Sequence, residues 1–149
     1  MSLSVNVSIE GVRSPLGRAR VVDVARATLT AEGVREAMVS ITFVDKKHIA
    51  KLNVQHLSHR GPTDVISFGF TRATKNDPVV GDIYICPDVA REHAVERDEP
   101  LRREIARLVV HGVLHVLGHD HPVDERRESS AMWIRQERLL ARLARRALV

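Results

Sequence analysis

Residues 111–121 read His111-Gly112-Val113-Leu114-His115-Val116-Leu117-Gly118-His119-Asp120-His121. His111 and His115 are four residues apart, and in a helix that spacing places both imidazoles on one face, one turn apart. Gly118 can adopt a left-handed backbone conformation that ends the helix and reverses the chain. The reversal can bring His121 back over the same face, so this stretch predicts a helix that ends in a cluster of three imidazoles.

Three neutral imidazoles around one point are typical of a catalytic rather than a structural zinc site, because a fourth tetrahedral position stays open. A structural site would more often include cysteine, and the one cysteine, Cys86, lies far away in the sequence. We therefore predict that His111, His115 and His121 bind one zinc ion, although nickel or copper would also bind such a set. Any one of these histidines could instead be an ordinary core residue. Three histidines at this spacing seldom occur by chance.

The residues around the three histidines restrict the class of reaction that such a site could catalyse. Zinc lowers the pKa of a bound water to about 7 and polarises a phosphoryl or carbonyl oxygen. Zinc peptidases with a His-Glu-x-x-His motif use the glutamate as general base, and Gly112 in its place argues against that class. Asp120 is a candidate to accept a hydrogen bond from a ligand imidazole, with a plain turn residue as the alternative. His119 is a weaker candidate ligand.

Outward from this stretch, predicted strands and helices alternate along the chain. Pro100 opens the helix that carries the first two histidines, and Asp124 is a candidate cap for a last helix with one apolar side. Near the N-terminus, Ser14-Pro15 has the form of a helix start, with Gly33 as its stop. The remaining predicted elements are strands at 5–9, 37–44, 65–68 and 81–86 and helices after Asp45 and at 87–96.

These elements favour an α/β (mixed α+β) fold with about four strands and five helices. Strand–helix–strand units early in the chain favour a small, mostly parallel sheet with helices packed against it. The second half adds a helical layer that carries the histidines. A chain of 149 residues fits one domain, and no repeat, low-complexity tract or linker divides it.

The composition bounds the class of protein and its partners. Apolar residues make up 44% of the chain, enough for a core without disulfides, and the single cysteine suits a reducing cytoplasm. No signal peptide or membrane-spanning stretch is visible, so we expect a cytoplasmic protein with no membrane partner. The net charge of +4 favours a polyanionic partner, nucleic acid first, with an ordinary solvated surface as an equally good explanation.

The histidine segment also resembles the signature H-G-x-L-H-x-x-G-x-D-H of the bacterial YbeY family of endoribonucleases, also called rRNA maturation factors. Residues 111–121 match every fixed position of that signature. Residues 62–68 resemble the family segment P-T-[DN]-V-[LI]-S-F, and residues 81–86 resemble its strand G-D-I-x-I-[CS]. The motifs occur in the family's order and the length agrees, so the resemblance covers nearly the whole chain.

The resemblance implies a single-domain α/β fold over residues 1–149 with a zinc ion on His111, His115 and His121. It implies a zinc-dependent, single-strand-specific endoribonuclease that acts in small-subunit rRNA maturation and in ribosome quality control. The implied partners are RNA, above all rRNA, the small ribosomal subunit and its assembly factors. Composition and spacing alone do not predict this substrate.

One position departs from the family pattern. The family commonly carries an arginine five residues before the proline of the P-T segment, and here that position is Leu57. Arg60 is a candidate replacement as the cation that contacts phosphate, because a guanidinium can bind two phosphoryl oxygens at once. Alternatively, Arg60 is an ordinary solvated loop residue. His59 is a second candidate for the cation that contacts phosphate.

The mechanism expected from these residues is cleavage of a phosphodiester bond in single-stranded or flexible RNA. A zinc-bound water, or a 2′-hydroxyl activated through the zinc, would attack while Arg60 stabilises charge on the phosphoryl oxygens. Thr63, Asp64 and Ser67 would shape the cleft, although turn chemistry and strand capping are the favoured explanation of Thr63 and Ser67. Aromatic residues make up only 3% of the chain, so basic side chains rather than base stacking would hold the RNA.

Two other functions stay open from the sequence. The first is a metallohydrolase of a non-nucleic substrate such as a peptide or small ester, which predicts no salt-sensitive interaction with RNA. The second is a non-catalytic ribosome-assembly or RNA-binding factor whose metal only stabilises the fold. It predicts that removal of a histidine ligand unfolds the protein.

Overall fold

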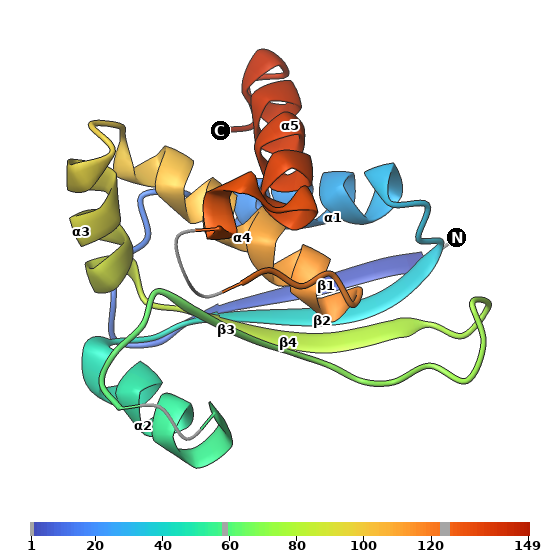
Figure 1. The fold of residues 1–149 in the computed structure, drawn as a ribbon, viewed down its shortest axis with the longest axis horizontal. Coiled ribbons are helices and arrows are strands. Elements are labelled where there is room, and N and C mark those ends of the chain that lie inside the picture. The colour runs from blue at the N-terminus through green and yellow to red at the C-terminus, as the bar shows by residue number, and fades with distance from the viewer. Residues whose placement is uncertain (1, 58–59, 123–125) are drawn as a thin grey trace.

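A four-stranded sheet forms the base of the fold (Figure 1). The structure is a computed structural model that describes residues 2–57, 60–122 and 126–149. The strands β1, β2 and β4 run parallel, whereas β3 pairs antiparallel with β4. Their bounds, in the spatial order β1-β2-β4-β3, are β1 (Ser2–Ile9), β2 (Glu36–Phe43), β4 (Val79–Ile85) and β3 (Val65–Gly69). The sheet is therefore mixed and mostly parallel, which confirms the predicted fold class.

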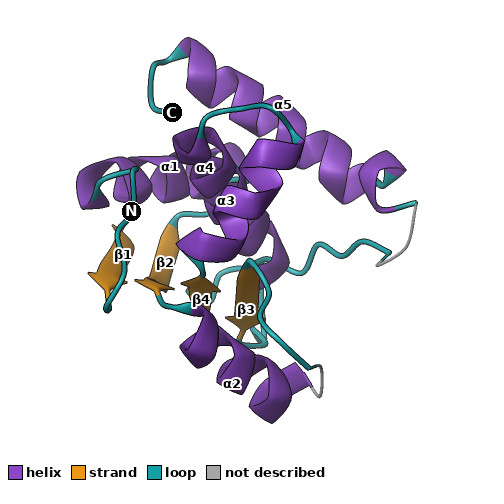
Figure 2. Cartoon of the chain, turned by 90° about the vertical axis from the view of Figure 1, so that its left-hand side faces the viewer, coloured by secondary structure: helices purple, strands orange, loops and turns teal. Residues whose placement is uncertain are grey.

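Five α-helices of the described chain pack around this sheet. Figure 2 shows α2 below the strands and the other four helices above them. A short 3-10 helix, η1 (Arg127–Ser129), precedes the last α-helix. None of the helices in the described ranges is long and apolar enough to cross a membrane. Their bounds are α1 (Arg18–Ala31), α2 (Lys46–Leu57), α3 (Pro87–Glu96), α4 (Leu101–Val116) and α5 (Ala131–Arg145).

Helix α4 is the centre of the molecule. It contacts β3 and β4 on one side and α1, α3 and α5 on the others. Its apolar side chains therefore enter the main core between the sheet and the helical layer, and most of its surface is buried. A second, smaller core that includes Ile49, Ile66 and the fully buried Cys86 lies on the α2 side. Because α4 carries two of the three predicted ligand histidines, the packing of α4 sets their position.

Glycines allow α4 to lie very close to the sheet. A Cβ atom on Gly69 of β3 would lie 2.5 Å from the carbonyl oxygen of Val116, at the end of α4. A Cβ atom on Gly112, between the two ligand candidates, would lie 2.8 Å from Cγ2 of Ile83 on β4. Both distances are shorter than a Cβ atom tolerates, so the close contacts of α4 with β3 and β4 require glycine at positions 69 and 112.

We expect Gly112→Ala to lower the free energy of unfolding by about 1–3 kcal/mol, because the added methyl group overpacks the contact with Ile83. This loss exceeds the gain of up to about 1 kcal/mol that alanine brings to a helix interior. Urea unfolding measures both effects together. The comparison is Gly17→Ala, where a Cβ atom meets no atom within 4 Å and the change is confined to the cap of α1, with an expected loss below about 1 kcal/mol. A Gly112→Ala protein more stable than the parent would show that α4 can shift away from the sheet freely.

Two predicted helix starts differ from the structure. Helix α1 begins at Arg18 and not at Ser14-Pro15, so that prediction was wrong. The Ser14 hydroxyl donates instead to the carbonyl oxygen of Leu16 at 2.8 Å, which forms a turn, and the extended Gly17 is the cap residue. Helix α5 is capped by Ser130, whose hydroxyl oxygen accepts a hydrogen bond from the Trp133 N–H at 3.2 Å. The sequence predicted Asp124 and not Ser130 as this cap, and Asp124 lies outside the described residues.

Candidate metal centre

Three imidazoles meet at the C-terminal end of α4. The ring centroids of His111 and His115 lie 4.6 Å apart, and the His121 ring lies 5.0 Å from each of them. Gly118 has a φ of +99°, a conformation that favours glycine, and the chain reverses there as predicted. One nitrogen of each ring lies within 4.8 Å of the other two. The structure thus brings together the three side chains that the sequence proposes as ligands.

Hydrogen bonds orient two of these rings. Nδ1 of His111 lies 2.6 Å from Oε1 of Gln136, and Nδ1 of His121 lies 2.8 Å from the carbonyl oxygen of Pro122. The Gln136 oxygen is the atom that faces His111, because its amide nitrogen donates to Glu137 at 3.1 Å. A carbonyl oxygen only accepts, so each Nδ1 carries the ring proton and each Nε2 keeps its lone pair.

The two Nε2 atoms that remain fit a metal ion. They lie 3.3 Å apart in His111 and His121. Two nitrogen ligands of a tetrahedral zinc with Zn–N bonds of about 2.05 Å are separated by about 3.3 Å. Lone pairs that face each other at this distance repel unless a cation lies between them. Both the donor set and its spacing therefore suit zinc.

Burial keeps the imidazoles of His111 and His115 neutral, which is the form that binds a metal. Burial lowers the pKa of His111 to about 4, and repulsion from a charged His115 is the second cause. Burial also lowers the pKa of His115, followed by repulsion from His121. Near neutral pH these two rings therefore carry no proton that a metal would have to displace.

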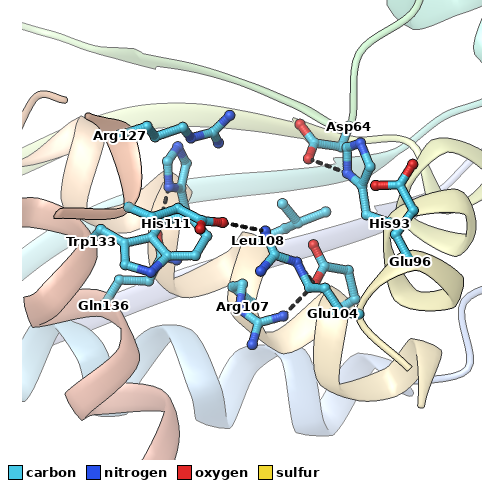
Figure 3. Close-up of a pocket in the computed structure, with 12 residues that line it drawn as sticks. Asp64, His93, Glu96, Glu104, Arg107, Leu108, His111, Arg127, Trp133 and Gln136 are labelled. Atoms are coloured by element: carbon cyan, nitrogen blue, oxygen red, sulfur yellow. Dashed lines mark hydrogen bonds and ion pairs between the residues drawn. The ribbon is translucent and has the colours of Figure 1, made fainter. Parts of the chain in front are cut away.

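A cavity of about 340 Å³ opens beside His111 (Figure 3). Its walls come from the chain before β3, from α3 and α4, and from η1 and α5. Charged groups of both signs face it, and the two sides of the cavity come from distant parts of the sequence. The lining residues are Asp64, His93, Glu96, Arg97, Glu104, Arg107, Leu108, His111, Arg127, Glu128, Trp133 and Gln136.

One buried guanidinium joins the acids behind this cavity. Arg107 forms ion pairs with Glu99 and Glu104, and its Nε donates to Oε2 of Glu137 at 2.9 Å. Arg107 and Glu104 are 6% and 2% exposed, so water screens their interaction little. Burial, followed by a hydrogen bond with Glu99, raises the pKa of Glu104 to about 7. Arg107 is the cation that keeps three carboxylates together here.

The same network reaches the imidazole cluster. Glu137 accepts hydrogen bonds from both Arg107 and the Gln136 amide, and the Gln136 oxygen faces Nδ1 of His111. A chain of four side chains therefore fixes the His111 ring. Such partners of a ligand histidine typically change metal affinity about 10–100-fold when removed.

A second group of possible ligand atoms lies on the other side of the cavity, in Asp64, His93 and Glu104. Asp64 Oδ2 is 3.0 Å from Nδ1 of His93, and Glu104 pairs with Arg107 and, at 3.6 Å, with Arg97. Each of these three groups already has an oppositely charged partner. Ion pairing within the protein therefore accounts for this group.

The Asp64–His93 pair gives a prediction about pH. The hydrogen bond to Asp64 raises the pKa of His93 above 6.5, so its contribution to stability is present below pH 6.5 and is lost as pH rises through the raised pKa. Burial acts to raise the pKa of Asp64, but the bond to His93 holds it below 3.8, so that contribution is lost only in stronger acid. We expect the pair to be strongest between these values.

The measurement is a double-mutant cycle with Asp64→Asn and His93→Gln, unfolded in urea at pH 5 and at pH 9. Because His93 is more than a third exposed, the coupling at pH 5 should be modest, about 1 kcal/mol, and it should vanish at pH 9. Equal coupling at the two pH values would show that the contact does not depend on a charged imidazole.

Comparisons with known proteins agree with this geometry. A model of the family described as endoribonuclease YbeY matches residues 12–144. The chain belongs to the YbeY family. The endoribonuclease YbeY of Bacillus licheniformis is 37% identical over 95% of this chain and 96% of its own length. That of Frankia alni is 36% identical over 93% and 82%, and that of Carboxydothermus hydrogenoformans is 43% identical over 78% of each chain.

The fold of a Thermotoga maritima protein, solved in solution, is also similar. It has a TM-score of 0.58 and 24% identity over 91% of this chain and 86% of that protein. At this identity the likeness concerns the fold alone. It agrees with the mixed sheet and the helical layer described above.

The YbeY-like segment at residues 62–68 is only partly brought to the cavity. Asp64 lines the cavity, whereas Thr63, Ser67 on β3 and the exposed Arg60 nearby are not among the lining residues. The candidate His59 lies outside the described residues. Leu57, where the YbeY pattern has arginine, ends helix α2 and is exposed.

The two polar residues beside the ligand candidates have local roles. Asp120 accepts a hydrogen bond from the backbone N–H of His121 at 2.8 Å, which is the turn role and not a bond to a ligand ring. Nε2 of His119 lies 2.8 Å from Oε1 of Glu32, so this ring pairs with a carboxylate on the α1 side. Neither side chain belongs to the imidazole cluster.

Sequence reasoning missed several residues of the site. Gln136, His93 and Glu104 were given no role at the site. The available signal was a polar side chain on an apolar helix face. Gln136 lies between Met132 and Leu139, and all three are buried.

Proposed function

We propose that this chain is a zinc-dependent, single-strand-specific endoribonuclease. The observation that carries the proposal is the pair of His111 and His121 Nε2 lone pairs 3.3 Å apart, completed by His115 and open to a charged cavity. Membership of the YbeY family supports RNA as the substrate, because the relatives are named endoribonucleases. We further propose that the RNA is ribosomal, in small-subunit maturation and ribosome quality control in the cytoplasm, with the small subunit and its assembly factors as partners.

In this proposal His111, His115 and His121 hold one zinc ion. Zinc in such a site supplies a Lewis acid and makes a nucleophile available near pH 7. Gln136 fixes the His111 ring through its bond to Nδ1. Asp64, paired with His93, forms the far wall of the cavity that would receive the scissile phosphate. Arg60, Thr63 and Ser67 lie outside that wall, so we assign them no role at the reacting phosphate.

The test combines metal content and RNA cleavage on one preparation. We expect about one zinc per chain, cleavage of a single-stranded oligonucleotide, and little cleavage of the same strand in a duplex. Chelation should abolish cleavage, and added zinc should restore it better than nickel or copper. Binding should weaken with salt, because basic side chains that contact the RNA phosphates release the counterions bound to the RNA.

Other outcomes point to other functions. Cleavage that survives chelation would contradict the metal-dependent mechanism. A zinc protein that binds RNA without cutting it would be an assembly factor. A zinc protein that shows no salt-sensitive interaction with RNA would be a hydrolase of some other substrate. For the ribosomal role, precursor small subunits should be cut at fewer positions than their deproteinised RNA, and identical cutting of both would argue against it.

A further inference from the structure

Arg127, the first residue of η1, has an unsatisfied group at the cavity. Figure 3 shows its side chain beside His111, with the guanidinium directed toward the Asp64 side of the cavity. Its Nε is buried and has no hydrogen-bond partner in the described parts of the chain. A buried N–H without an acceptor is destabilising, and native structures contain few of them. The position therefore suits an acceptor that comes from outside the protein.

Ion pairing separates Arg127 from the other two arginines of the cavity wall. Arg107 pairs with three carboxylates, and Arg97 pairs with Glu104 and Glu128. No carboxylate of a described residue forms an ion pair with Arg127. Among the described residues, its positive charge therefore has no carboxylate in direct contact.

An aromatic ring helps to hold the guanidinium in place. Cζ of Arg127 lies 5.8 Å from the centroid of the Trp133 ring. Stacking on a ring uses the face of a guanidinium and leaves the N–H groups at its edge available. Arg127 is thus held without losing its donors.

Arg127 also lies close to the imidazole cluster. Arg127 and His111 line the same cavity, and Figure 3 draws the Arg127 side chain beside the His111 ring. An anion bound to Arg127 would therefore lie next to a candidate zinc ligand.

We propose that Arg127 binds a phosphate group of a single-stranded polynucleotide at the edge of the candidate metal centre. The Nε–H and one Nη–H of a guanidinium match two oxygens of a phosphodiester, and such paired, charge-assisted bonds are short and strong. The inference rests on the proposed function, and it names the group that holds the reacting strand.

The test compares Arg127→Met with Arg138→Met. Arg138 is exposed on α5, so its replacement removes the same charge from a position outside the cavity. The probe is a 2′-O-methyl phosphorothioate oligonucleotide, which resists cleavage, added to the zinc-loaded protein. We expect Arg127→Met to weaken binding about ten-fold and to lower the slope of log affinity against log salt by about 0.7–1. Arg138→Met should have a much smaller effect on affinity.

The single tryptophan reports where the strand binds. Trp133 lies against Arg127, so the oligonucleotide should change its fluorescence in wild type and in Arg138→Met, and much less in Arg127→Met. On a cleavable strand, kcat/KM of Arg127→Met should fall about 10²-fold at unchanged zinc content. If Arg127→Met loses zinc or unfolds, Arg127→Gln takes its place in the same comparison.

Equal affinity and equal fluorescence change in the Arg127 and Arg138 variants would overturn the phosphate site. That result is distinct from failure of the proposed function. If the wild-type protein binds the oligonucleotide through Arg127 but never cuts RNA, the nuclease proposal is wrong and the phosphate site stands. If it cuts RNA with no dependence on Arg127, the nuclease proposal stands and the phosphate site is wrong.

Discussion

Replacement of His115 by alanine should remove the bound zinc and lower RNA cleavage about 10³-fold or more, while the protein stays folded. Loss of a residue that only orients a ligand already reduces metal affinity or activity about 10–100-fold, and a direct ligand should matter more. His115 is partly exposed in the last turn of α4, so its truncation removes little from the core. Zinc content, circular dichroism and cleavage are measured on the same sample.

His119→Ala is the matched control for this variant. It removes an imidazole four residues further along, which pairs with Glu32 and lies outside the cluster. It should keep its zinc and its activity. If His115→Ala and the wild type cut RNA equally, the activity comes from a contaminant. If His115→Ala unfolds, the metal stabilises the fold, and the assembly-factor alternative becomes the better account.

The part of the site that the sequence predicts is the part made by local chain geometry. His111 and His115 are brought together by one turn of helix, and Gly118 turns the chain so that His121 joins them. These relations depend only on helix periodicity and on the backbone freedom of glycine. They therefore hold before any tertiary packing is known.

The rest of the site depends on how distant segments pack. Gln136 reaches His111 across 25 residues, and Arg107 reaches Glu137 across 30, because α5 lies on α4. No pattern along the chain indicates which residues of the two helices face each other. The same limit explains the choice of Arg60 as the cation at the reacting phosphate. Arg60 is close to the P-T segment in the sequence, but Arg127 lines the cavity and Arg60 does not.

The sheet shows the same division between local and long-range information. Alternating strands and helices predict parallel neighbours for β1, β2 and β4, because each connection carries a helix across the sheet. β3 and β4 are joined without a helix and pair antiparallel. The start of α1 was missed because a proline after a serine also suits the turn that Ser14 forms.

Arg107→Met should lower the free energy of unfolding by about 3–5 kcal/mol, because it leaves buried acids without their cation. Glu99 and Glu104 are nearly buried, whereas Glu137 is a third exposed and should relax toward water. The comparison is Arg103→Met, which removes one partly exposed ion pair with Glu99 and should change stability by less than about 1 kcal/mol. Urea unfolding at one pH measures the loss of stability in both variants. Equal losses of unfolding free energy would contradict a special role for Arg107.

The pH dependence and the zinc site test the same network further. Without Arg107, burial should raise the carboxyl pKa values above their unfolded value near 4.5. Groups with raised pKa values stabilise the fold below the unfolded pKa and lose that effect as pH rises, so the variant should be relatively weaker at pH 8 than at pH 5. Adding Glu104→Gln should restore part of the stability at pH 8. Because Glu137 would then hold Gln136 and His111 less firmly, zinc affinity should fall about 10-fold, and unchanged affinity would show that the His111 ring is fixed without this network.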